Sequence, residues 1–127
     1  MDLSHFKELY LKTSFEQLQH LHDGLQELAY DKENDHGIAA AYINAHTLVS
    51  KSMLMGYTDV GLVAHGIEKI FYKIKAHEIS LSLELLALVT TASNQLEKSL
   101  QQIEKNELPT DLSTQKASLE KIIGEPL

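Results

Sequence analysis

The sequence contains no cysteine, which limits both its cross-links and its metal chemistry. Without thiols the chain forms no disulfide and offers no thiolate ligand to a metal ion. A chain free of disulfides suits a reducing compartment, and we therefore expect a cytoplasmic location.

Proline is almost as scarce, since Pro109 and Pro126 are the only two in 127 residues. No proline interrupts the chain between Met1 and Leu108, which favours long helices. Hydrophobic residues make up 43% of the chain and charged residues 23%, as in ordinary globular proteins and unlike disordered chains. At this length we expect one domain with a single core.

Long apolar runs and basic clusters are also missing. No window approaches the apolar length that crosses a membrane, and the opening residues, MDLSHFKEL, do not have the pattern of a signal peptide. The formal net charge is −7 and the basic residues form no stripe. Neither a membrane nor a nucleic-acid backbone is therefore an expected partner.

Apolar residues recur at steps of three and four along four long segments, which is the period of a helix with one buried face. The first predicted helix runs from about Ser4 to Tyr30, and residues 31–37 form a polar connector. The second helix leads to Gly56, which can take a left-handed backbone conformation. Thr58 is the expected N-cap of the third helix.

The fourth predicted helix follows a linker over residues 76–81, has Ser82 as its N-cap and ends before Pro109. The predicted core stripes are Leu11, Phe15, Leu18, Leu21, Leu25 and Leu28 in the first helix; Ile38, Ala41, Ala45, Leu48, Ser52 and Met55 in the second; Val60, Val63, Ile67, Ile70 and Ile74 in the third; and Leu83, Leu86, Val89, Ser93, Leu96, Leu100 and Ile103 in the fourth.

Short connections between successive long helices imply antiparallel neighbours. The predicted fold is therefore all-α, an antiparallel up-down-up-down four-helix bundle with a short fifth C-terminal helix. We expect the bundle to occupy residues 1–108, and a linker with the short helix to occupy residues 109–127. The fifth helix has an apolar face that we expect to dock on the bundle: Leu112, Leu119, Ile122 and Ile123.

The stretch from Ala45 to Glu68 carries two histidines and one carboxylate between the apolar stripes. His65 and Glu68 are three residues apart and therefore project from the same face of a helix. If the second and third helices pack antiparallel about Gly56, His46 comes beside that face. The sequence thus predicts a His/His/Glu cluster at the edge of the bundle.

The cluster is flanked by residues at helical spacing that we expect to be at least partly exposed. Gly61 leaves room on the third helix. Together the flanking residues form the predicted partner-binding face: Tyr42, Val49, Ser50, Met53, Gly61 and Tyr72.

The other histidines and the acidic connector give weaker signals. His20 and His22 are two residues apart and point away from each other on a helix, so we expect solvated surface and no metal pair. In the connector DKENDHG the glycine comes one place late for a calcium loop, and position twelve falls on Tyr42, so we predict a plain loop. The remaining histidines are expected at the surface: His5, His36 and His77.

The residues around His46 resemble the histidine phosphotransfer (HPt) domain that opens CheA-type chemotaxis histidine kinases. The pattern of that family is A-H-T/S-L-K-G-S-A-x-x-x-G-F, followed by A-H-x-L/I-E. Here the corresponding segments read AHTLVSKSMLMGY from Ala45 and AHGIE from Ala64. The spacings from the first histidine to the glycine, the second histidine and the glutamate all match, and the resemblance covers residues 4–105.

The resemblance implies a phosphorelay in two-component signalling, in which His46 is phosphorylated on Nε2, Glu68 accepts a hydrogen bond from Nδ1, and His65 completes the network. The implied partners are a histidine kinase catalytic domain and a response-regulator receiver domain, and the isolated domain is expected to be a monomer. The sequence has no glycine-rich phosphate loop and no magnesium-binding acid cluster. We therefore expect a phosphoryl carrier, alone or as the first domain of a longer kinase, with no ATP site, metal or cofactor of its own.

The chain departs from the family pattern after His46. The family has lysine and then glycine where this chain has Val49 and Ser50, and Lys51 lies about 140° around the helix from His46, poorly aimed as a substitute. Two functions stay open: phosphotransfer through His46, or a degenerate HPt-like adaptor that binds a kinase or receiver without being phosphorylated. The intact histidines and glutamate favour phosphotransfer. A generic bundle that binds a metal or small ligand is disfavoured, because no carboxylate–histidine set has ligand spacing.

Overall fold

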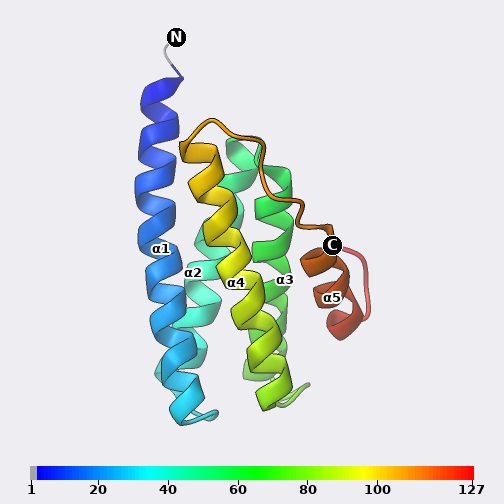
Figure 1. Cartoon of the computed structure of the whole chain (residues 1–127). Coiled ribbons are helices and arrows are strands. Elements are labelled where there is room, and N and C mark those ends of the chain that lie inside the picture. Colours follow the sequence, from blue (N-terminus) through cyan, green and yellow to red (C-terminus); the bar gives the residue numbers. More distant parts are fainter. Residues whose placement is uncertain (1–2) are drawn as a thin grey trace.

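The computed structural model describes residues 3–127, which form five helices and no strand. These are α1 (Ser4–Tyr30), α2 (Asp35–Leu54), α3 (Thr58–Lys75), α4 (Leu83–Glu104) and α5 (Ser113–Ile123). The first four alternate in direction and close a ring of neighbours, while α5 lies on the outer side of α3 (Figure 1). The predicted four-helix bundle with a short fifth helix is confirmed. Over this part of the chain, no helix combines the length and apolar character needed to cross a membrane.

The core is built from the predicted apolar stripes. Leu18, Leu48 and Leu96, from α1, α2 and α4, are each no more than 1% exposed, as is Ile67 of α3. Leu83 is the one wrong member, because it is 66% exposed. The buried face of α4 is centred near Val89, and Leu83 lies about 120° around the helix from that residue.

The connector between α1 and α2 is shorter than predicted. α2 begins at Asp35, because the Asn34 side chain caps it and accepts a hydrogen bond from the Gly37 amide at 2.8 Å. The predicted loop over residues 31–37 is therefore wrong for its last three residues. The first turn of α2 was missed because it begins with two polar residues, Asp35 and His36. Both are exposed and so add nothing to the apolar stripe.

The turns on either side of α3 were predicted with one error. Gly56 has the expected left-handed conformation, with φ of 82°, and Ser82 caps α4 by accepting a hydrogen bond from the Leu85 amide at 3.0 Å. Thr58 is not the N-cap of α3 but its first helical residue. Tyr57 takes the N-cap position without a side-chain hydrogen bond, and its ring stacks on that of Tyr10 at 5.1 Å.

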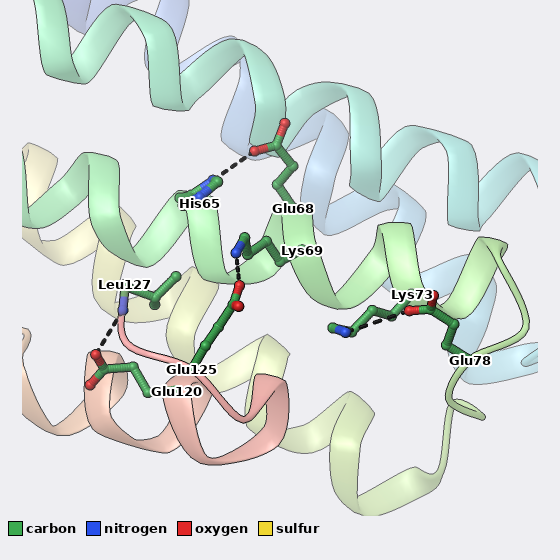
Figure 2. Close-up of polar contacts among 8 residues, drawn as sticks. All are labelled: His65, Glu68, Lys69, Lys73, Glu78, Glu120, Glu125 and Leu127. Carbon is green, nitrogen blue, oxygen red and sulfur yellow. Dashed lines mark hydrogen bonds and ion pairs between the residues drawn. The ribbon is translucent and has the colours of Figure 1, made fainter.

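α5 packs against α3 at Gly66. A Cβ atom on this glycine would lie 2.9 Å from the side chains of both Leu119 and Leu127, so the missing side chain permits the close approach. Leu119 is fully buried as a result. Polar contacts also fasten the residues after α5, as Figure 2 shows: Lys69 pairs with Glu125, and the Leu127 amide donates to Glu120 Oε2 at 2.8 Å.

The close approach of α1 and α2 provides a test of the packing. A Cβ atom on Gly37 would lie 2.9 Å from the Gly24 carbonyl oxygen and 2.9 Å from Leu28 Cγ, and the backbone contact cannot be relieved by a rotamer change. We expect Gly37→Ala to lower the free energy of unfolding by about 1–3 kcal/mol, although alanine has the higher helix propensity. Chemical denaturation measures the change, with the exposed Ala39→Ser as control. A stabilised Gly37→Ala protein would contradict the close approach.

An exposed histidine–glutamate pair beside the connector between α1 and α2 predicts that the stability of the fold depends on pH. His36 Nδ1 lies 2.7 Å from Glu27 Oε2, and the hydrogen bond and charge of this carboxylate raise the pKa of His36 above its ordinary value. The pair therefore stabilises the fold below the ordinary histidine pKa, and this contribution disappears as the pH rises through the raised pKa. In an NMR titration, we expect the His36 midpoint to fall in Glu27→Gln. Equal midpoints in the two proteins would show that the pair is not formed.

Candidate functional site

Glu68 joins the two histidines of the predicted cluster. Its Oε2 contacts Nδ1 of His46 from α2, and its Oε1 lies 2.9 Å from Nδ1 of His65, one turn earlier on α3. Figure 2 shows the Glu68 side chain leaving α3 toward α2, with His65 beside it. The carboxylate is 12% exposed, against 58% for the His46 side chain and 37% for His65. The three predicted side chains thus meet at the seam between α2 and α3, with His46 outermost.

An alanine precedes each histidine, and both alanines lie beneath the cluster. Ala45 and Ala64 are fully buried. Small side chains at facing positions allow two helices to approach closely. The antiparallel turn at Gly56 sets the register of α2 against α3, so that His46 arrives opposite Glu68.

The contact with Glu68 decides which nitrogen of His46 is available for chemistry. An ionised carboxylate only accepts hydrogen bonds, so the proton of the neutral ring lies on Nδ1 and the lone pair on Nε2. Nδ1 faces the seam and the ring is more than half exposed, so Nε2 is the nitrogen presented outward. Such an arrangement can orient a nucleophile, because the carboxylate lies beside a ring that would gain positive charge on attack through Nε2.

Tyr42 stacks on His46 from one turn earlier on α2. The two ring centres are 6.1 Å apart and the rings are inclined by only 15°. Lys75, at the C-terminal end of α3, places its Nζ over the Tyr42 ring at 5.9 Å from the ring centre. The sequence reasoning missed Lys75, although it follows Glu68 and Tyr72 at steps of seven and three residues and therefore shares their helix face.

The rest of the predicted partner-binding face is less uniform than expected. Ser50, Met53 and Tyr72 are exposed. Val49 is half-buried and packs on the core. Gly61 is buried beneath Met53, because a Cβ atom there would lie 2.9 Å from the methionine Sδ. The room that Gly61 leaves is therefore filled by Met53 from the facing helix.

Lys51 points away from His46, as its position on the helix predicted. Its Nζ donates to Thr13 Oγ1 and, at 2.8 Å, to Gln17 Oε1, both on α1. Burial against α1 lowers the pKa of Lys51. This lysine supports the packing of α2 on α1 and supplies no charge to the cluster.

The other histidines occupy the predicted surface with one exception. His22 Nε2 lies 3.1 Å from Glu97 Oε2 on α4, and its side chain is only 19% exposed, so the prediction of solvated surface is wrong for this residue. It lies next to the buried Leu21 and faces α4, a direction that the two-residue spacing from His20 does not reveal. Residues 3–127 contain no group of three or more His, Cys, Asp or Glu arranged to hold a metal ion. Outside the cluster, the exposed histidines of residues 3–127 are His5, His20, His36 and His77.

A protein-family model matches most of the chain. The model of the family described as Hpt domain matches residues 5–106, which include α1 from its second residue, the whole of α2, α3 and α4, and all three members of the cluster. The chain belongs to the Hpt family. The resemblance drawn from the motif around His46 is thereby confirmed.

This HPt domain is also similar to parts of larger proteins. It is 25% identical to the chemotaxis protein CheA of Listeria monocytogenes over 117 residues, which cover 91% of this chain and 19% of that protein. It is 27% identical to the chemotaxis protein CheA of Bacillus subtilis over 103 residues, which cover 81% of this chain and 15% of that protein. The chain thus spans less than a fifth of the length of these relatives.

The contact between Glu68 and His46 predicts a defined tautomer in this HPt domain. We expect the ring nitrogen shifts in NMR to show neutral His46 with its proton on Nδ1. Glu68→Ala removes the acceptor, so the proton should redistribute toward Nε2. Glu78→Ala, which removes a carboxylate that pairs with Lys73 outside the cluster, is the matched control and should leave His46 unchanged. An Nδ1 proton that persists in Glu68→Ala would show that another group sets the tautomer.

Proposed function

We propose that this HPt domain carries a phosphoryl group in two-component signalling and that His46 is the phosphorylated residue. The single observation that supports the proposal best is the contact of Glu68 with His46 Nδ1, which leaves Nε2 outward as the nucleophile. The membership of the Hpt family and the similarity to CheA proteins support the same function.

The proposed reaction needs no proton transfer at His46. The Nε2 lone pair attacks the γ-phosphorus of ATP held by a kinase catalytic domain, the new N–P bond forms, and the P–O bond breaks with its electron pair on ADP. The ring then carries a positive charge, which Glu68 stabilises while Nδ1 keeps its proton. In the second step a receiver aspartate oxygen attacks the phosphorus, the N–P bond breaks, and its electron pair returns to Nε2.

In this reaction the partner domains, and not the HPt domain, hold the nucleotide and any metal ion. Each partner must reach Nε2 from solvent, and His46 stands at an exposed position with Ser50 and Met53 following it on the same side of α2. Tyr72 extends this exposed surface onto α3. We propose that these residues form the surface that a kinase domain and a receiver domain contact in turn.

Val49 is the observation that favours a second candidate, an adaptor that binds a kinase or receiver without being phosphorylated. Lysine occupies this position in the family pattern, whereas Val49 packs on the core and supplies no charge. The phosphoryl carrier remains the better supported function, because an adaptor has no need for a half-buried carboxylate that orients an exposed histidine.

The two candidates separate in a labelling experiment with phosphoramidate, a small phosphoryl donor. For the carrier we expect one added phosphate by intact mass, located on His46 Nε2 by nitrogen-resolved NMR, and its rapid loss when a receiver domain is added. His46→Gln should abolish the label, whereas the exposed His77→Gln should retain it. Slow labelling scattered over several histidines, with no effect of His46→Gln, would exclude the carrier and leave the adaptor.

A further inference from the structure

The lysines of α2 and α3 differ in whether they have a polar partner. Lys51 is directed to α1, and Figure 2 shows two of the others engaged with carboxylates: Lys69 with Glu125, and Lys73 with Glu78 at 3.5 Å. Lys75 forms no ion pair or hydrogen bond within residues 3–127, and its contact is with the Tyr42 ring. Among the lysines of these two helices, Lys75 is therefore the one with a free ammonium group, and it lies over the ring that stacks on His46.

A phosphoryl group on His46 would be stabilised by a positive charge nearby. The phosphoryl oxygens carry about two negative charges, and Glu68 adds a third at the opposite edge of the same ring. The imidazolium charge compensates only one of them. Without a further cation, the product is opposed by repulsion between the phosphoryl group and the carboxylate.

Tyr42 connects the free lysine to the histidine. The Tyr42 ring stacks on the His46 ring. The Lys75 ammonium lies over the same Tyr42 ring, 5.9 Å from its centre. Lysine has a flexible stem of four carbons and a compact charge, so the ammonium can move from the aromatic face to a nearby anion. The His46 ring is meanwhile restrained from two directions, by Glu68 at Nδ1 and by Tyr42 at its face.

We infer that Lys75 supplies the positive charge for the phosphoryl group on His46, in place of the lysine that the family pattern has where this chain has Val49, and that Tyr42 is a positioning residue for both side chains. The inference rests on the proposed phosphorylation of His46. It assigns Lys75 no covalent step, since its ammonium approaches the phosphoryl oxygens and keeps all its protons. The charge thus comes from the last turn of α3 and not from α2.

The experiment measures the initial rate of phosphoramidate labelling at His46, which isolates the chemistry from docking of a partner. We expect Lys75→Gln to slow labelling about threefold to tenfold, the effect of one partly screened charge. Lys75→Arg should retain the rate, and Lys73→Gln is the matched control that should change nothing. Added salt should shrink the difference between the wild-type protein and Lys75→Gln, because it screens the charge.

Two further variants test the assignment of the charge and of Tyr42. Val49→Lys in the Lys75→Gln background should restore the rate, since it returns a lysine to the face of His46. Tyr42→Phe should label normally, whereas Tyr42→Ala should slow labelling and move the His46 ring proton shifts by removing the aromatic ring current. That shift change is visible without phosphorylation and checks the stacking by itself.

The outcomes separate this inference from the function on which it rests. Wild-type protein that takes no phosphate on His46 would overturn both. Normal labelling of His46 together with an unchanged rate in Lys75→Gln would overturn the role of Lys75 and leave the phosphoryl carrier standing. A slower rate that neither Lys75→Arg nor Val49→Lys rescues would indicate damage to the packing and would also overturn it.

Discussion

A carboxylate that is largely buried must find hydrogen-bond donors in the protein, because most of its water is gone. Glu68, at 12% exposure, meets this requirement with one Nδ1 group from each of two helices. The requirement sets the distance between α2 and α3 at the seam, which in turn needs the small residues Ala45 and Ala64 beneath it. It also orients His46, so the packing of the bundle and the direction of this ring depend on the same contact.

The other side of α2 is fastened to α1 by a separate set of polar contacts. Tyr10 and Ser52 share a buried hydrogen bond of 2.8 Å, and Lys51 donates to Thr13 and Gln17. Held on both sides, α2 has little freedom to rotate about its axis. An exposed histidine on a helix that is held in this way keeps a constant direction.

A charge that is absent from one helix of a bundle can be supplied from another. Val49 stands where the family pattern has a lysine, and it packs on the core, while Lys75 stands over the Tyr42 ring that stacks on His46. Side chains from different helices converge at the seam, so the position of a charge in space is less restricted than its position in the sequence. A motif with one substituted residue therefore does not by itself show that the site has lost its chemistry.

The helical period of the apolar residues was sufficient to predict the four long helices, and Gly56 and Ser82 marked two of their ends. The start of α2 escaped prediction because its cap, Asn34, and its exposed first turn carry no apolar signal. Leu83 was assigned to the core because it continues a series of steps of three and four residues. Such a series can move gradually around the helix, and at Leu83 it has left the buried face. His22 was assigned to solvent because its own helix gives no sign of the Glu97 carboxylate on α4.

The sequence by itself determined the fold class and the common face of His65 and Glu68, since spacing within a helix dictates which side chains share a face. It placed His46 beside them only on the condition that α2 and α3 pack antiparallel about Gly56. Only the tertiary structure decided that one carboxylate serves both histidines, that Met53 fills the space at Gly61, and that Lys75 reaches Tyr42. The physical reason is that helical periodicity sets the direction of a side chain relative to its own axis. Which neighbour lies in that direction, and at what depth, is set by the packing of the whole bundle.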